Sequence, residues 1–316
     1  LRYLDSAPRL HDGSHAALLV LSASWAALEE ARAASEASPA EHATLAISLC
    51  ETYEAAMKSG ALTPLMPQLV PALLSLLSVG GARAAGCAAL AALATAVEWF
   101  CKTEEARPQM GEVLERVRQA VAPSLMSSPE QLAESAELGA RYLDLLYRAA
   151  LFCSLALFGA PLVLHSALHL LVPCLRQPQR ELLRSACSLL ARLASAAEAP
   201  QLAPHLESLA QPLLGALVSA VATHAPEGLP ARVDDALRTL LQCCGGRARE
   251  WLANAVLREE CGPLVGAEAK QQLVQAALEL LDDNRSFRAL VCDFQMLCRA
   301  TAPPPREAMQ TTYFVV

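Results

Sequence analysis

The spacing of apolar residues constrains this chain more than any other feature of its sequence. Apolar side chains recur at i, i+3, i+4 and i+7 through nearly the whole length, which is the pattern of one buried helix face. Gly, Pro, Ser or Asp-Asn interrupts it roughly every 20 residues. No stretch shows the strict alternation of a half-buried strand. We therefore expect an all-α protein.

The interruptions divide the chain into segments of helical length. Pro stands at an expected first turn in SPAE at 38–41, in SPE at 128–130 and in QP at 177–178, where its missing N–H costs nothing. The helices that we expect span 14–34, 39–59, 61–79, 82–101, 106–126, 129–157, 160–175, 178–197, 201–223, 229–244, 246–257, 266–282 and 284–300.

Composition excludes several classes of protein. Hydrophobic residues make up 54% of the chain and aromatic residues only 4%, so the core must be built from Ala, Leu and Val. Such a core suits packed helices better than a β-sandwich, and it is too apolar for a disordered chain. The net charge of −7 argues against a general nucleic-acid binder.

Two long stretches without Lys, Arg, Asp or Glu, 59–82 and 149–175, are long enough to span a membrane. The first contains Pro64, Pro67 and Pro71, and GAP at 159–161 divides the second. Each stretch therefore breaks into pieces of the size used for buried helices, and we expect no membrane insertion. A membrane-associated helical protein remains the weakest of the alternatives.

A short motif centred on proline repeats along the chain. LVPAL at 69–73 returns as LVPCL at 171–175, with weaker copies VAPSL at 121–125 and AQPL at 210–213, and WAAL at 25–28 fits the same frame. The copies lie roughly 40 to 50 residues apart, the length of a HEAT-like helix pair.

A recurring proline in the first helix of each pair favours a solenoid over a bundle. Proline bends a helix, and a repeated bend lets outer helices wrap around inner ones. We therefore predict an α-solenoid of about six HEAT-like antiparallel helix pairs over 14–300. Residues 1–13 are expected to be disordered or part of a preceding repeat, and 301–316 a flexible tail. The predicted inner helices are 39–59, 82–101, 129–157, 178–197 and 229–244.

The C-terminal segments REWLANAVL at 249–257, KQQL at 270–273 and FQMLCR at 294–299 resemble the last repeats of the importin-β superfamily of nuclear transport receptors. The resemblance is to the branch of that superfamily that contains importin-13 and transportin-3, and CETYE at 50–54 and LMPQL at 65–69 resemble the importin-13 member more than its sister. It runs from about Trp25 to Arg299 and is carried by helix pattern and scattered identities.

This resemblance implies a superhelical receptor that binds folded protein cargo on its concave face and shuttles between cytoplasm and nucleus. It also implies contacts with nucleoporins and control by the GTPase Ran through N-terminal repeats that this chain lacks, so that the chain would be the C-terminal, cargo-side arch. One departure is that helix 39–59 has no Arg and only Lys58. Recognition of phosphorylated Arg-Ser domains needs a cationic fork and is therefore not expected.

Acidic residues on the predicted inner helices are the candidates for cargo contact, because a negative wall would attract basic nuclear proteins. The alternative is an ordinary solvated helix face. The candidates are Glu51, Glu54, Glu98, Glu134, Glu137 and Asp144.

Eleven cysteines, an odd number without any C-x-x-C motif, predict free thiols in a reducing compartment. Cys243 and Cys244 precede Gly245-Gly246-Arg247. This segment is either a reactive thiol beside an arginine and a helix start or, as we favour, a glycine helix cap with packed cysteines behind it.

His165 and His169 stand at the i, i+4 spacing that zinc sites use, but the sequence offers no complete ligand set. We interpret them as core or groove histidines. Tyr142, Tyr147, Phe152 and Trp251 are expected between helices.

No P-loop, G-x-S-x-G or G-x-G-x-x-G motif occurs. We expect no enzyme, no metal and no cofactor. The main hypothesis is a C-terminal fragment of a nuclear transport receptor that acts by binding and release. The alternative is a HEAT or armadillo scaffold that assembles cytoplasmic complexes without Ran.

Overall fold

The computed structural model describes residues 16–38, 42–58, 66–78, 83–100, 107–225, 230–258, 261–263 and 265–300. Within these ranges the chain is helical, without a strand. The expected segments 1–13 and 301–316 lie outside the described residues.

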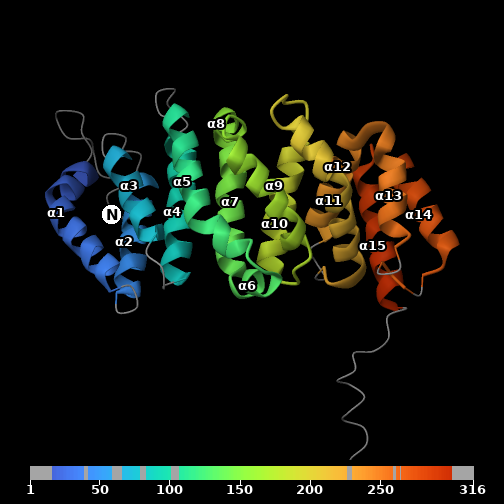
Figure 1. The fold of residues 1–316 in the computed structure, drawn as a ribbon, viewed down its shortest axis with the longest axis horizontal. Helices are drawn as coiled ribbons and strands as arrows, with labels where there is room; N and C mark the ends of the chain where they lie inside the picture. The colour runs from blue at the N-terminus through green and yellow to red at the C-terminus, as the bar shows by residue number, and fades with distance from the viewer. Residues whose placement is uncertain are drawn as a thin grey trace, which may run out of the picture.

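The helices form two parallel layers, and Figure 1 shows them as a row from α1 to α15. The A layer holds the first helix of each pair: α1 (Ala16–Ala37), α3 (Met66–Ser78), α5 (Arg107–Leu125), α9 (Pro161–Leu175), α11 (Ala203–Thr223) and α13 (Ala248–Val256). The B layer holds the second: α2 (Ala43–Lys58), α4 (Arg83–Phe100), α7 (Ala136–Phe152), α10 (Arg180–Ala194), α12 (Pro230–Cys244) and α15 (Asn284–Ala300). Short elements join them: α6 (Pro129–Glu134), α8 (Ser154–Phe158), the 3-10 helix η3 (Gly245–Arg247) and α14 (Ala267–Glu279).

Packing between helices is local along the chain. Each B-layer helix packs on the next one in the order α2, α4, α7, α10, α12, α15, and the A-layer helices follow in the same way. Substantial contacts join elements no more than four places apart in the chain order. A repeat that touches only its neighbours defines a solenoid, which confirms the predicted α-solenoid of HEAT-like pairs.

The repeating prolines lie where the sequence placed them. Pro71, Pro123, Pro173 and Pro212 lie inside α3, α5, α9 and α11, all in the A layer. The opposite faces of these helices supply the core. Leu69, Leu73, Leu171 and Leu213, for example, are fully buried.

Polar contacts between repeats join residues that lie about one repeat length apart in the sequence. Arg148 Nη1 bonds Glu98 Oε2 at 2.9 Å across 50 residues, and both Nε and Nη2 of Arg192 donate to the carbonyl oxygen of Ala150, 42 residues away. Arg288 Nε reaches Asp234 Oδ2 at 2.7 Å across 54 residues. Arginines of α7, α10 and α15 therefore tie these three helices to the preceding repeat, in addition to the packing between helices.

One expected helix is wrong in its extent. The segment 129–157 is three helices, α6, α7 and α8, because the backbone leaves helical geometry at Ser135 (φ −104°, ψ 22°) and at Cys153 (φ −141°, ψ 51°). The apolar pattern continues through both breaks, so periodicity alone does not reveal them. The breaks allow α7 to align between α4 and α10, while α8 packs on α5.

The two stretches considered as membrane spans are divided as predicted, and their described helices α3 and α9 have 13 and 15 residues. Among the described residues one helix, α11, is long and apolar enough for a span by length and composition. More than half of that window is buried inside the stack, where α11 packs against α9, α12, α13 and α15.

Candidate functional site

The six acidic candidates lie in the N-terminal half of the stack, on α2, α4, α6 and α7. Glu51 and Glu54 are on α2, Glu98 is on α4, Glu134 ends α6, and Glu137 and Asp144 are on α7. Since α2, α4 and α7 are consecutive B-layer helices, five of the six residues share one layer of the molecule.

Most of these carboxylates are engaged with cations of the same region. Glu54 pairs with Lys58 at 2.6 Å, and Glu98 and Asp144 both pair with Arg148, at 2.9 and 3.3 Å. Part-exposed ion pairs contribute little net stability, but they neutralise much of the negative field that the sequence suggested.

Glu134 is also paired. Its Oε2 lies 3.1 Å from Nη2 of Arg83, which additionally donates from Nη1 to the Glu134 carbonyl oxygen at 2.8 Å. Glu51 and Glu137 are exposed, and no ion pair joins them to any described residue. They are the two carboxylates that remain available to a partner.

The C-terminal half of the B layer has the opposite charge. The helices α10 and α15 each carry three arginines and one carboxylate. Among the B-layer helices α2 thus has a net negative charge, α4, α7 and α12 are balanced, and α10 and α15 have a net positive charge, a distribution that the acidic candidates alone did not indicate.

An exposed apolar edge lies where α7, α8 and α9 meet. Leu155 is 76% and Leu162 62% exposed, and Leu151 and Phe152 are also exposed. Half of the described large apolar side chains that face solvent thus fall within 151–162. Phe152 was expected in the core together with Tyr142, which is fully buried. That expectation was wrong for Phe152, because it lies on the solvent side of the last turn of α7, where Ala149 and Ala150 are the residues that face the stack.

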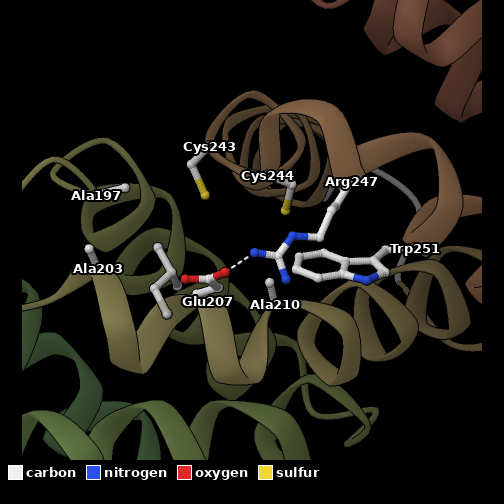
Figure 2. A pocket seen from close by; sticks show the side chains of 9 residues that line it. Ala197, Ala203, Glu207, Ala210, Cys243, Cys244, Arg247 and Trp251 are labelled. Atoms are coloured by element: carbon white, nitrogen blue, oxygen red, sulfur yellow. Dashed lines mark hydrogen bonds and ion pairs between the residues drawn. The ribbon is translucent and has the colours of Figure 1, made fainter.

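A cleft of ≈ 280 Å³ lies between α11 and the junction of α12, η3 and α13. Figure 2 shows Glu207 and Ala210 rising from α11, while Cys243, Cys244, Arg247 and Trp251 line the opposite side. Its floor is apolar, because small alanines and Leu206 complete the lining.

Local sequence builds the cleft wall. The α12 helix ends at Cys244, and Gly245 follows with φ +53°, a left-handed conformation that favours glycine. The predicted glycine cap is therefore confirmed. The turn places Arg247 over the Trp251 ring, with the guanidinium carbon 5.0 Å from the ring centroid. Arg247 also forms an ion pair with Glu207 of α11.

One of the two cleft thiols, Cys243, differs in the direction of its pKa shift from the other described cysteines whose pKa is shifted. Burial raises the pKa of Cys50 to about 12 and of Cys261 to about 11. The pKa of Cys243 is instead lowered, because the neighbouring Cys244 donates a hydrogen bond to it. The same interaction, together with burial, raises the pKa of Cys244.

The histidine pair also acquires a neighbour that sequence reasoning missed. His165 and His169 on α9 are exposed, with ring centroids 4.3 Å apart, and His205 on α11 lies 5.9 Å from His165. Burial and the two neighbouring rings lower the pKa of His169. Among the residues that the structure describes, no three His, Cys, Asp or Glu side chains converge closely enough to hold a metal ion. His165 and His169 are thus exposed histidines of the A layer and not core ones.

The fold defines a class: a HEAT-type α-solenoid with an importin-β-like fold. Among solved structures the chain is similar to one described as importin-13 in its cytosolic state, with a TM-score of 0.73 and 14% identity over 94% of this chain. At that identity the likeness is one of fold. The chain spans about a third of that protein, 33% of its length. No family model matches the sequence, and no curated protein matches it.

Proposed function

We propose that this chain binds folded protein cargo as the C-terminal part of a nuclear transport receptor. The observation that carries the proposal is the extended two-layer stack, whose order of helices resembles importin-13 over nearly the whole chain. A solenoid with contacts only between neighbours changes its pitch through small rotations at each repeat, which opens or closes a large binding surface.

Two surfaces support a protein partner. The exposed carboxylates Glu51 and Glu137 lie on the B-layer helices α2 and α7, with α4 between them, and suit a basic protein. The apolar edge around Leu155 and Leu162 is the kind of exposed patch that marks protein interfaces. On this proposal the B layer is the inner, cargo-facing wall. The protein shuttles between cytoplasm and nucleus, with Ran acting through further N-terminal repeats and nucleoporins binding elsewhere.

A binding titration with a core histone dimer, a compact basic nuclear protein, tests the cargo surface. Changing Glu51→Lys together with Glu137→Lys should weaken binding by about fivefold or more at low salt, since close charge pairs steer and register complexes. The matched control changes Glu112→Lys and Glu250→Lys, two exposed carboxylates of the A layer. Equal weakening by both pairs would mean that net charge, and not the B-layer surface, governs binding.

A second experiment separates the transport receptor from the scaffold alternative. A pull-down of the full-length protein with an identified cargo is carried out with GTP-bound and with GDP-bound Ran. Release or recruitment of cargo that depends on the GTP form supports the receptor. Cargo retention that is identical with both forms would replace it by a scaffold that works without Ran.

A further inference from the structure

Cys243 and Cys244 occupy a position unlike that of the other described cysteines. Figure 2 shows both sulfur atoms directed into the cleft between α11 and the α12–η3–α13 junction. Seven of the other described cysteines are buried in the stack, and only Cys292 is partly exposed as well. A reagent in solution therefore meets a shaped cavity at Cys243, whereas most thiols of this cysteine-rich chain are covered by packed helices.

The cleft carries groups that would hold an anionic thiol reagent. Arg247 lies at the mouth, more than half exposed, with its charge shared between the Glu207 carboxylate and the Trp251 ring. A carboxylate brought into the cleft competes with Glu207 for this guanidinium, which binds carboxylates in a two-pronged geometry. The volume of ≈ 280 Å³ accommodates a tripeptide-sized group in part, with the remainder extending past the open mouth.

We propose that Cys243 is a modification site that forms a mixed disulfide with a small anionic disulfide of the glutathione type, seated in this cleft against Arg247. In the reaction the Cys243 thiolate attacks one sulfur of the disulfide. A bond forms between Sγ and that sulfur, the original S–S bond breaks, and the second half leaves as a thiolate with the bonding electron pair. The proton lost from Cys243 passes to solvent or to the leaving thiolate, so the exchange needs no other oxidant.

The adduct persists because Cys244 is badly placed to displace it. Adjacent Cα atoms are about 3.8 Å apart, shorter than the roughly 4.4 to 6.8 Å that disulfides usually span, and both residues lie in the last turn of α12. Cys244 therefore serves as a hydrogen-bond donor that favours the Cys243 thiolate, rather than as a resolving thiol. The adduct would add bulk to the cleft between α11 and the α12–η3–α13 junction, where helices of two repeats meet. It would therefore change the packing of these helices.

The test incubates the chain with oxidised glutathione and follows adduct formation by intact mass and site-resolved peptide mapping. The first adduct should map to Cys243, and Cys243→Ser should slow the first addition at least tenfold. Cys292→Ser, which removes the other partly exposed thiol outside the cleft, should leave the rate unchanged. A first adduct on Cys292, or an unchanged rate in Cys243→Ser, would overturn the proposal.

Two further variants test the roles of the neighbours. Cys244→Ala should raise the pKa of Cys243 and slow the reaction about threefold for each unit of that rise. A higher pKa lowers the fraction of Cys243 that is thiolate, and the greater nucleophilicity of each remaining thiolate offsets part of this loss. Cys244→Ser, which keeps a donor, should stay closer to the wild-type rate. Arg247→Gln should slow modification by oxidised glutathione about two- to fivefold, the range of an exposed charge pair, without slowing neutral bis(2-hydroxyethyl) disulfide. Equal slowing with both reagents would refute the role of Arg247 charge.

Discussion

The ion pair between Asp234 and Arg288 offers the sharpest test of how the last repeats are held together. Asp234 of α12 is fully buried, while the Arg288 side chain of α15 is 45% exposed, and Arg288 Nε lies 2.7 Å from Asp234 Oδ2. The other carboxylate oxygen, Oδ1, accepts the backbone N–H of Asp235 at 2.9 Å. Removing Arg288 thus leaves a buried carboxylate with one remaining donor.

The expected cost follows from this burial. Breaking a fully buried pair by removing one partner costs about 3 to 5 kcal/mol. Because nearly half of Arg288 already contacts water, solvent can replace part of what it provides, and we expect Arg288→Ala to destabilise this region by about 2 kcal/mol. Adding Asp234→Asn to Arg288→Ala should recover about half of the lost stability, because the amide leaves no unpaired charge buried at this position.

The measurement must be local, because a solenoid need not unfold in one step. Amide hydrogen exchange of α12 and α15 reports their opening, and urea unfolding followed by circular dichroism reports the whole chain. The matched control is Arg285→Ala, which removes an exposed arginine of the same helix and should change the stability by less than about 0.5 kcal/mol. If Arg288→Ala opens these helices no more than Arg285→Ala does, the pair contributes only as an ordinary surface contact, and the reasoning fails.

Three other substitutions test the packing and the pH response. Gly262→Ala should destabilise the chain by about 2 kcal/mol in urea unfolding, because Gly262 has φ +57° and an added Cβ would lie 2.8 Å from Cys298 Sγ. The control Gly266→Ala, whose Cβ would meet open space, should be nearly neutral. Leu190→Ala in the core of α10 should lower the free energy of unfolding by about 2 to 5 kcal/mol in the same measurement. Leu155→Ala on the apolar edge should lower it by less than about 0.5 kcal/mol. Similar losses of stability would mean that the edge is buried in solution. Burial lowers the pKa of His224 below its ordinary 6.5, and its Nε2 contacts the Leu175 carbonyl at 3.0 Å. The folded state therefore binds fewer protons than the unfolded one at this site. Its stabilising contribution is present above about pH 6.5 and declines as the pH falls below that value. The Tm of the wild type should consequently drop more between pH 7.5 and 5.5 than that of His224→Gln, and equal drops would exclude His224 as the cause.

Prediction from sequence succeeded where a signal is written into consecutive residues. The apolar period of 3.6 residues placed the helices, and the proline motif near Pro71 and Pro173 identified the A layer. It failed at Ser135 and Cys153, where α6, α7 and α8 separate. There the breaks follow from the alignment of α7 with α4 and α10, and no residue of breaking type marks them.

The candidate site shows the same division. The acidic residues could be assigned to helices, but Arg148, which pairs with Asp144 on its own helix, also neutralises Glu98 from about 50 residues further along the chain. The Cys243-Cys244-Gly245 segment was visible in sequence, yet Glu207 of α11, which pairs with Arg247 across the cleft, was not. The third histidine, His205, was missed for the same reason, since it lies on the next A-layer helix.

The sequence by itself determined that this chain forms amphipathic helices in a repeat of nearly constant length, because helical periodicity and proline bends are properties of residues close together in the chain. Only the tertiary structure decided which charges are available, which thiols are open to solvent and where a cleft forms. Those properties depend on which side chains of successive repeats meet. The way that successive helix pairs stack sets which side chains meet, and part-buried contacts between residues roughly 40 to 54 positions apart contribute to this stacking.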